Sequence, residues 1–340
     1  MTEFRLGRKY ILRIAKNTEQ TAKIEVKEIN SGSSGGKIGK TSSADLLSLP
    51  PDSDVSAVKF ENHQIVAKIS STKKSSTNST PVTITIYNVA PDTLQKIKAE
   101  STIILQAGYE TDKELPIIYA GQVIKIKPSK AGPDRLLQLV CSEGYTVQKN
   151  VRFNKSFPPG NTYKQILDNL ISEAVEYGIP LGGFYTTPQT TSKDLPPSTS
   201  TTRLEIKPSS GFLAEGNLML SISKLCEQIG FRCYLALGKL YVEPKEYAKN
   251  LEVIKITPDL IIGEVQPEKD TSKSLTGGTT NKIGVKVRTF LDGRINLAKK
   301  IHIVEGDYKG YYDIDSVSHN LNYEGGDWST TIDLVDVTDG

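Results

Sequence analysis

Residues that could act as nucleophiles, bases or metal ligands are few and scattered. The chain has 340 residues and three histidines, His63, His302 and His319, and each histidine lies in a stretch that alternates apolar and polar residues. A catalytic nucleophile needs an adjacent base and a third group that orients the base. No cysteine, histidine or glutamate stands at a motif spacing from any of these histidines. We therefore interpret all three as half-exposed structural residues of strands.

The cysteines also lack a pattern that predicts chemistry. Cys141, Cys226 and Cys233 are surrounded by apolar residues, and the last two are seven positions apart. This spacing is not typical of a zinc site, and no fourth ligand is near. An odd number of cysteines argues against a scaffold built on disulfides. We expect three buried free thiols.

Two glycine-rich motifs come close to catalytic signatures. Residues 32–36 (GSSGG) match G-x-S-x-G, but a nucleophile elbow requires a helix behind the serine, and a Gly/Ser loop follows instead. Residues 34–42 (SGGKIGKTS) resemble a phosphate-binding loop, except that Ser34 occupies the position of the first glycine. The segment behind it reaches Pro50 after about two helical turns, which is too short for a helix that holds phosphate at its N-terminus. The sequence favours a flexible loop at 31–43 over a nucleotide site.

Acidic residues gather near the C-terminus without forming a recognisable metal site. Calcium needs about six or more oxygen ligands, usually from one loop that contains glycine. The spacing of the acidic residues matches no such loop, and we expect solvated carboxylates of strands and turns and no bound metal or cofactor. These residues are Glu305, Asp307, Asp313, Asp315, Glu324 and Asp327.

Overall composition is that of a soluble globular protein. Hydrophobic residues make up 37% of the chain, and 42 Lys and Arg against 39 Asp and Glu leave a net charge of +3. Because the basic residues are spread along the whole chain, they do not form the concentrated basic face that nucleic-acid binding needs. No apolar run approaches the ~20 residues that span a bilayer, and the first residues lack the apolar core of a signal peptide. We expect no membrane insertion and assembly in a cytoplasm.

Alternation with a period of two predicts strands over most of the chain, because successive side chains of a strand point to opposite faces. Short strands separated by turn residues are typical of an antiparallel sandwich or barrel. The predicted strands cover residues 21–29, 55–70, 81–89, 101–110, 117–128, 135–143, 282–290, 300–306, 311–323 and 327–337.

The centre of the chain has a helical period instead. Residues 161–178 and 215–230 each place apolar residues on one helical face and end at a glycine, and 231–245 follow as a hairpin that turns at Leu237-Gly238. Stretches rich in Ser, Thr, Pro and Gly predict exposed loops at 31–43, 186–211 and 268–281. The sequence thus predicts a β domain, an α+β centre and a second β domain.

Residues 82–128 contain a strand that ends in Ile-Tyr-Asn at 86–88 and a later Ala-Gly-Tyr at 107–109, and residues 293–337 contain a Gly-Asp-Tyr turn at 306–308 and a Gly-Gly-Asp-Trp hairpin at 325–328. With these features the two stretches resemble the opening and the closing barrel of a known family, the baseplate hub proteins of contractile-tailed phages of the Mu-like and T-even-like kind. We interpret Trp328 in the second stretch as the packing anchor of the last hairpin. The positions that carry the resemblance are Ile86, Tyr87, Asn88, Gly108, Tyr109, Gly121, Gly306, Tyr308, Val317, Gly325, Gly326 and Trp328.

The resemblance implies a mainly β fold in which two antiparallel β-barrel domains flank a small region of helices and a hairpin. The resemblance covers roughly residues 55–340, which we divide into a first barrel (55–150), a middle domain (151–250) and a second barrel (251–340). The N-terminal extension with a flexible loop (1–54) and the insertion 186–211 in the middle domain depart from the family outline.

The resemblance also implies a non-enzymatic virion protein without cofactors. Three copies would form a ring around the delivery channel, with a tail tube or tube-initiator protein on one side and the central spike on the other. Other baseplate proteins would bind outside, and DNA would only pass through during genome ejection.

Two other classes of function remain open from the residues alone. The 15 tyrosines are compatible with a carbohydrate-binding or adhesion β module of a phage tail, although such modules usually expose more than the single tryptophan present here. A phosphate-loop nucleotide hydrolase or a peptidoglycan hydrolase would need the motifs that residues 34–42 and the scattered histidines do not complete.

Overall fold

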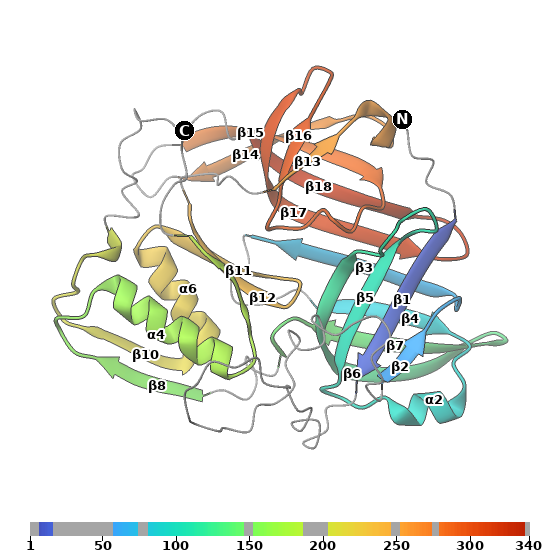
Figure 1. Ribbon diagram of the computed structural model, residues 1–340, viewed down its shortest axis with the longest axis horizontal. Helices are drawn as coiled ribbons and strands as arrows, with labels where there is room; N and C mark the ends of the chain where they lie inside the picture. Colours follow the sequence, from blue (N-terminus) through green and yellow to red (C-terminus); the bar gives the residue numbers. More distant parts are fainter. Residues whose placement is uncertain are drawn as a thin grey trace.

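The computed structural model describes residues 7–15, 57–73, 81–145, 152–185, 203–245, 252–273 and 279–336. Antiparallel strands dominate these residues, and the two longest helices lie together on one side of the molecule (Figure 1). The predicted mainly β fold with an α+β centre is confirmed. None of the described helices combines the length and the apolar character needed to cross a membrane.

A first β region combines an N-terminal strand with six strands that follow residue 56. Hydrogen bonding orders the strands β3-β4-β7-β6-β5-β1-β2. Val82, Ile84 and Ile86 of β4 point into the core and the threonines between them face away, as the alternating pattern predicts. The elements are β1 (Arg8–Ala15), β2 (Ala57–Phe60), β3 (Ile65–Thr72), β4 (Val82–Tyr87), α2 (Pro91–Lys96), β5 (Thr102–Tyr109), β6 (Ile117–Ala131) and β7 (Asp134–Ser142).

A second β region follows at the C-terminal end. Its main strands are ordered β14-β15-β18-β17, and the short strand β16 pairs with β17 on one side and, in parallel, with β13 on the other. The elements are β13 (Val253–Ile256), the short 3-10 helix η2 (Pro258–Leu260), β14 (Gln266–Lys273), β15 (Thr279–Phe290), β16 (Lys300–Ile303), β17 (Gly310–Asn322) and β18 (Trp328–Asp336).

Strand β17 joins the two β regions into one sheet. Its residues Ser316–Asn322 pair with Val66–Thr72 of β3, while its other edge pairs with β18. The resulting sheet has 13 strands, and a closed barrel is not detected in the pairing of the strands that the structure describes. The two β domains expected from the sequence therefore share a hydrogen-bonded junction.

The middle region packs two helices on short strands. Helix α4 begins with a capping box, in which Thr162 and Gln165 each accept the backbone N–H of the other, and Asn217 caps α6 by accepting the N–H of Leu220. These caps explain where both predicted helices start. The elements are β8 (Arg152–Phe157), α4 (Tyr163–Glu176), β9 (Leu181–Phe184), β10 (Phe212–Asn217), α6 (Leu218–Gln228), β11 (Phe231–Ala236) and β12 (Lys239–Pro244).

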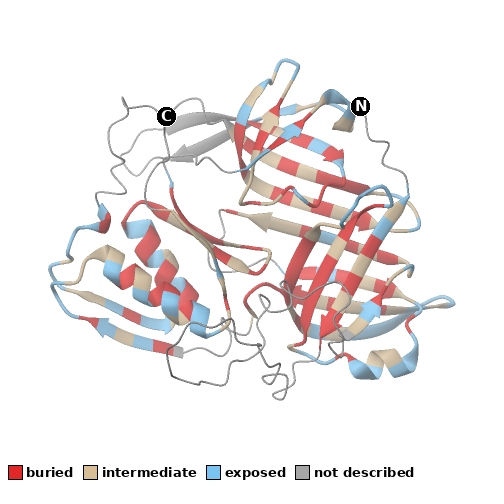
Figure 2. Ribbon diagram, viewed as in Figure 1, coloured by how far each residue is buried: buried red, intermediate tan, exposed pale blue. Residues whose placement is uncertain are grey.

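The β11–β12 hairpin is buried on both faces, which explains its nearly continuous apolar sequence. Phe231 and Cys233 pack into the core of the middle region beneath α4 and α6, whereas Tyr234 and Ala236 pack into the core of the second β region. Figure 2 shows this hairpin as buried along most of its length. The hairpin therefore connects two of the three hydrophobic cores.

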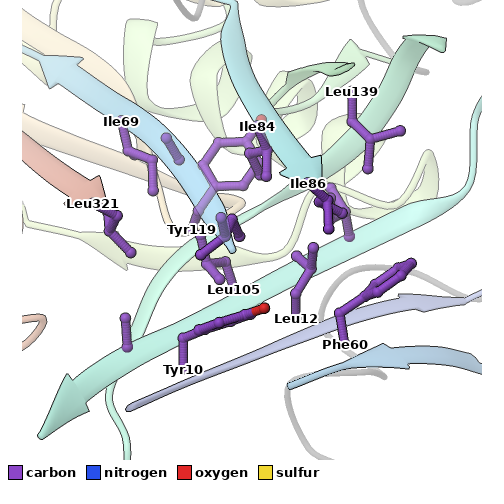
Figure 3. Packing of buried hydrophobic residues seen from close by; sticks show 14 of the residues in the cluster. Tyr10, Leu12, Phe60, Ile69, Ile84, Ile86, Leu105, Tyr119, Leu139 and Leu321 are labelled. Atoms are coloured by element: carbon purple, nitrogen blue, oxygen red, sulfur yellow. The ribbon is translucent and has the colours of Figure 1, made fainter. Parts of the chain in front are cut away.

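The core of the first β region contains residues from both ends of the described chain. Figure 3 shows Tyr10 and Leu12 of β1 packing with Ile84 and Ile86 of β4, and Leu321 of β17 lies at the edge of the same cluster. Burial of side chains of this size contributes about 1.5–3 kcal/mol each. The cluster ties β1 and β17 to the first region.

Some segment boundaries differ from the sequence predictions. The predicted strand 55–70 is interrupted by a turn at Asn62, whose φ is +58°, and forms β2 and β3. Residues 268–273 and 279–281 of the predicted loop 268–281 lie in β14 and β15, which pair with each other because polar strands can still pair through their backbone groups. Residues 8–15, which lie in the predicted extension, form β1 between β5 and β2.

Other predictions fall wholly or partly outside the described residues. The predicted strand 21–29 and the loop 31–43, with both glycine-rich motifs, are among these. The predicted insertion 186–211 is described only from residue 203 onward, where Leu204 is buried in the core of the middle region.

Candidate functional site

The first family-like stretch places Asn88 at a turn that fixes the end of β4. Asn88 has a φ of +56°, which asparagine tolerates better than most residues. Its side-chain oxygen accepts the backbone N–H of Arg135 at 3.1 Å, and its amide donates to Asp134 at 3.0 Å. The preceding Ile86 is buried, and Tyr87 is half-buried at the strand end. The hydrogen bonds of Asn88 therefore connect the start of β7 to the end of β4.

Two glycines of the same stretch allow close approach of neighbouring groups. A Cβ on Gly108 would lie 2.2 Å from a carboxylate oxygen of Asp112, which accepts the N–H of the buried Tyr109 at 2.8 Å. A Cβ on Gly121 would lie 2.8 Å from the backbone oxygen of Ser142. Neither position can hold a larger residue without movement of the backbone or of a bonded side chain.

In the second stretch, three positions shape the turn before β17 and the strand itself. Gly306 adopts a φ of +94° in the turn, and the backbone oxygen of Tyr308 accepts the hydroxyl of Tyr312 at 2.8 Å. Val317 is buried in the core of the second β region. These residues stabilise the second region and lie apart from the positions of the first stretch.

Trp328 is where the two stretches meet. Its indole N–H donates to the backbone oxygen of Gly108 at 3.2 Å, and the ring is only 5% exposed. The Arg8 guanidinium lies 5.6 Å from the ring centroid and donates to the backbone oxygen of Gly326 at 2.9 Å, next to Gly325 in the preceding turn. Trp328 thus anchors more than the last hairpin, because its contacts reach β1 and β5 of the first region.

A buried cluster of charged residues joins all three regions. Lys73, which follows β3, lies 2.8 Å from Asp313 of β17 and 3.3 Å from Glu243 of β12. Arg232 of β11 contacts the same two carboxylates at 2.5 and 2.7 Å, and the hydroxyl of Tyr234 donates to Glu243 at 3.1 Å. Two cations and two anions balance each other in the cluster, which we call the junction network.

Burial and the neighbouring charges shift the pKa of Arg232 in the junction network in opposite directions. Burial alone lowers the pKa of Arg232, but the nearby carboxylates of Glu243 and Asp313 raise it above its ordinary value. The prediction that Asp313 is a solvated carboxylate is therefore wrong, because a residue of the first β region reaches it through the β3–β17 pairing. Such a paired network positions the regions and provides no free acid or base.

A second buried carboxylate connects the first and middle regions. Glu143, which follows β7, is 5% exposed and accepts backbone N–H groups from Leu237 and Gly238 in the β11–β12 turn. Burial raises the pKa of Glu143 to about 7, although the two N–H groups act in the opposite direction. Leu237 and Gly238 both have positive φ, which confirms the predicted hairpin turn and identifies it as type I′.

The remaining candidate groups offer no catalytic arrangement in the part of the chain that the structure describes. His63 and His302 are half-buried as predicted, but His63 lies in the turn between β2 and β3 and not in a strand. His302 stacks on Tyr311 with ring centroids 4.2 Å apart. The prediction of half-exposure is wrong for His319, which is 3% exposed and hydrogen-bonded to Thr330 at 3.0 Å. Within the described ranges, no three His, Cys, Asp or Glu side chains form a group that could hold a metal ion. The three cysteines are buried and free, as predicted.

Comparison with known proteins identifies the fold. No protein-family model matches the chain, and no curated protein matches it in sequence. The 43 kDa tail protein of prophage MuSo2 from Shewanella oneidensis is similar in structure, with a TM-score of 0.54 and 9% identity over 82% of this chain and 94% of that one. The tail protein from Neisseria meningitidis MC58 gives a TM-score of 0.53 and 9% identity over 82% of this chain and 93% of that one.

A third similar structure comes from a larger assembly. A chain of the half-lidded Francisella PdpA-VgrG complex has a TM-score of 0.55 and 9% identity, and the match covers 98% of this chain and 58% of that chain. At this identity the similarity establishes the fold alone. The resemblance predicted from residues 82–128 and 293–337 is confirmed at that level, since the chain shares the fold of phage tail proteins over nearly the whole length of two of them.

Proposed function

We propose that the chain is the structural hub of a phage-type contractile-tail baseplate. Three copies form a ring that connects the tail tube to the central spike and surrounds the delivery channel. The observation that carries the proposal is the fold shared with a prophage tail protein and with a second tail protein, over 94% and 93% of their chains.

The strand order supports assembly into a ring. The main path of the sheet ends at β2 and β14, and a side branch ends at β13; each of these three strands pairs with only one other strand in the part of the chain that the structure describes. An edge strand offers N–H and C=O groups to another chain, and two different edges on one copy allow head-to-tail contacts that close under rotation. We propose that the neighbouring copies meet along these edges.

The junction network and the Trp328 contact support a force-transmitting role for the protein in the virion tail. Both hold parts of the chain together that are far apart in sequence. A hub that transmits force between tube and spike needs such rigid connections between its regions. The twelve family-like positions, which fix turns, close approaches and core contacts, are proposed to be structural for the same reason.

We further propose that the spike and the tube proteins are the main partners and that the protein has no enzymatic activity. The similarity to a chain of the PdpA-VgrG complex supports a spike-type partner, although this chain spans only 58% of that one. Tube-initiator and other baseplate proteins would bind elsewhere on the ring, and DNA would pass through the channel.

Electron microscopy of the purified full chain, alone and with the spike protein encoded in the same genome, tests the proposal. We expect rings of three copies with six β lobes around a central channel, in at least one of the two samples. Single copies in both samples would contradict the hub and would favour a carbohydrate-binding module, which a glycan array would then detect.

A further inference from the structure

An apolar groove lies between α2 and the β6–β7 hairpin, outside the contacts described so far. Its volume is about 310 Å³. Pro91 and Leu94 of α2 form one wall, and Pro128 and Leu137 of the hairpin form part of the other. Figure 1 shows the hairpin projecting from the molecule beside α2. Among the described residues that line this groove, the charged ones are Lys130 and Arg135 of the hairpin.

The hairpin turn fixes which residues of β6 and β7 face one another. Ala131 pairs with Asp134, so the turn contains only two residues, and Gly132 has a φ of +61°. A two-residue turn that begins with such a glycine is type II′ and sets the register of both strands. Lys130 is therefore placed directly opposite Arg135.

One face of the hairpin changes from apolar to cationic along its length. Side chains at every second position share a face, so Ile126, Pro128 and Lys130 of β6 point the same way. Their partners on β7 are Leu139, Leu137 and Arg135. The apolar pairs lie next to the core and along the groove, and the last pair on this face consists of two cations.

This pair of cations is unfavourable within the chain. Like charges directly opposite each other in an antiparallel pair destabilise a sheet. Lys130 and Arg135 are both exposed, and neither forms an ion pair with any residue that the structure describes. An anion bound between them would remove the repulsion, and the apolar walls beside them would bind a large side chain.

We propose that this groove binds an acidic peptide segment of a partner protein. A large apolar side chain of the segment lies against Leu94 and Leu137, and carboxylates next to it pair with Lys130 and Arg135. A nucleic acid would leave the apolar walls unused, and a neutral apolar ligand would leave the two cations facing each other. The proposal does not depend on the hub function, because it rests only on the residues that line the groove and on the register of the hairpin.

A displayed library of random peptides of about 12 residues, selected against the full chain, tests this assignment. We expect the enriched peptides to combine a large apolar residue with neighbouring Asp or Glu. A synthetic peptide of the consensus sequence should bind the chain with Lys130→Glu and Arg135→Glu at least about tenfold more weakly, since two ion pairs are replaced by repulsion.

The control carries Lys125→Glu and Lys127→Glu, which change the net charge by the same amount on strand β6 of the same hairpin but do not line the groove. We expect this variant to bind the peptide like the wild type, and melting curves should show that both variants are folded. The assignment is wrong if no peptide is enriched, if the enriched peptides are basic or uncharged, or if both variants bind equally. Self-association of the wild type that Lys130→Glu and Arg135→Glu abolish, without peptide binding, would instead assign the groove to a second copy.

Discussion

Replacement of Glu143 by glutamine should remove a pH-dependent cost of docking the first β region on the β11–β12 turn. The carboxyl is buried and its pKa lies at about 7 in the folded chain, compared with its ordinary value of 4.5. Each pKa unit corresponds to 1.36 kcal/mol, so the difference amounts to about 3 kcal/mol. Because the folded state binds this proton more tightly than the unfolded state, the stabilisation is present below about pH 4.5 and is lost as the pH rises through about 7.

The neighbours of Glu143 do not titrate in this range. Burial raises the pKa of Tyr119 and of Tyr241 above the ordinary value and that of Cys141 to about 12, so all three stay neutral. Glutamine keeps an oxygen that can accept an N–H from Leu237 or Gly238 but carries no charge at any pH. The comparison of the two proteins therefore isolates the charge.

Urea unfolding of the wild type and of Glu143→Gln between about pH 4 and 8 measures the effect. The unfolding free energy of the wild type, relative to the variant, should decrease by about 3 kcal/mol across this range and stay constant above it. Contributions from other groups, including His319, are present in both proteins and cancel in the difference. A difference that does not change with pH would refute the reasoning, and one that grows with pH would show that the two N–H groups outweigh the cost of burial.

Other substitutions test the remaining junctions. Trp328→Phe removes the donor to the Gly108 oxygen but keeps an aromatic ring, so urea unfolding should show a loss of about 1–3 kcal/mol, and no loss would mean that this hydrogen bond is not stabilising. Lys73→Met leaves the buried carboxylates short of a cation and should lower the unfolding free energy by about 3–5 kcal/mol. The double variant with Asp313→Leu should lose less stability than the two single variants do in sum. Additive losses would contradict the pairing. Burial lowers the pKa of His319 to about 4. The unfolding free energy of the wild type should therefore fall by about 3 kcal/mol relative to that of His319→Gln as the pH falls from about 6.5 to 4. Equal acid sensitivity of the two proteins would contradict this.

The elements that the sequence predicts well are those specified by neighbouring residues. Helix α4 has its capping box and its apolar face within one segment, and the β11–β12 turn is set by Leu237 and Gly238. Strand β4 alternates within six residues. Local preferences and the tertiary structure agree in these segments, so the pattern alone is sufficient.

Contacts between distant segments could not be predicted in the same way. Nothing near Asp313 in the sequence indicates that Lys73 will neutralise it, because the two meet only through the pairing of β3 with β17. Strand β1 could not be predicted for a related reason. Its partner β5 lies far along the chain, and basic residues interrupt the apolar pattern of β1. The candidate site depends on these distant pairings, so sequence patterns identified its residues singly but not the groups that they form.

The junctions also bear on how the proposed ring would work. Strand β17 contributes to both β regions, and the β11–β12 hairpin contributes to two cores. A displacement of one region would therefore break hydrogen bonds or expose apolar surface in another. We expect each copy to move as a rigid unit in the baseplate.

The most direct test of the hub proposal is the mass of the native assembly, measured for the full chain alone and mixed with the spike protein from the same genome. Three copies of the 37.3 kDa chain would give about 112 kDa, and a bound spike would add its own mass to this value. A trimer in either sample is the predicted result. A mass of one chain in both samples would contradict it.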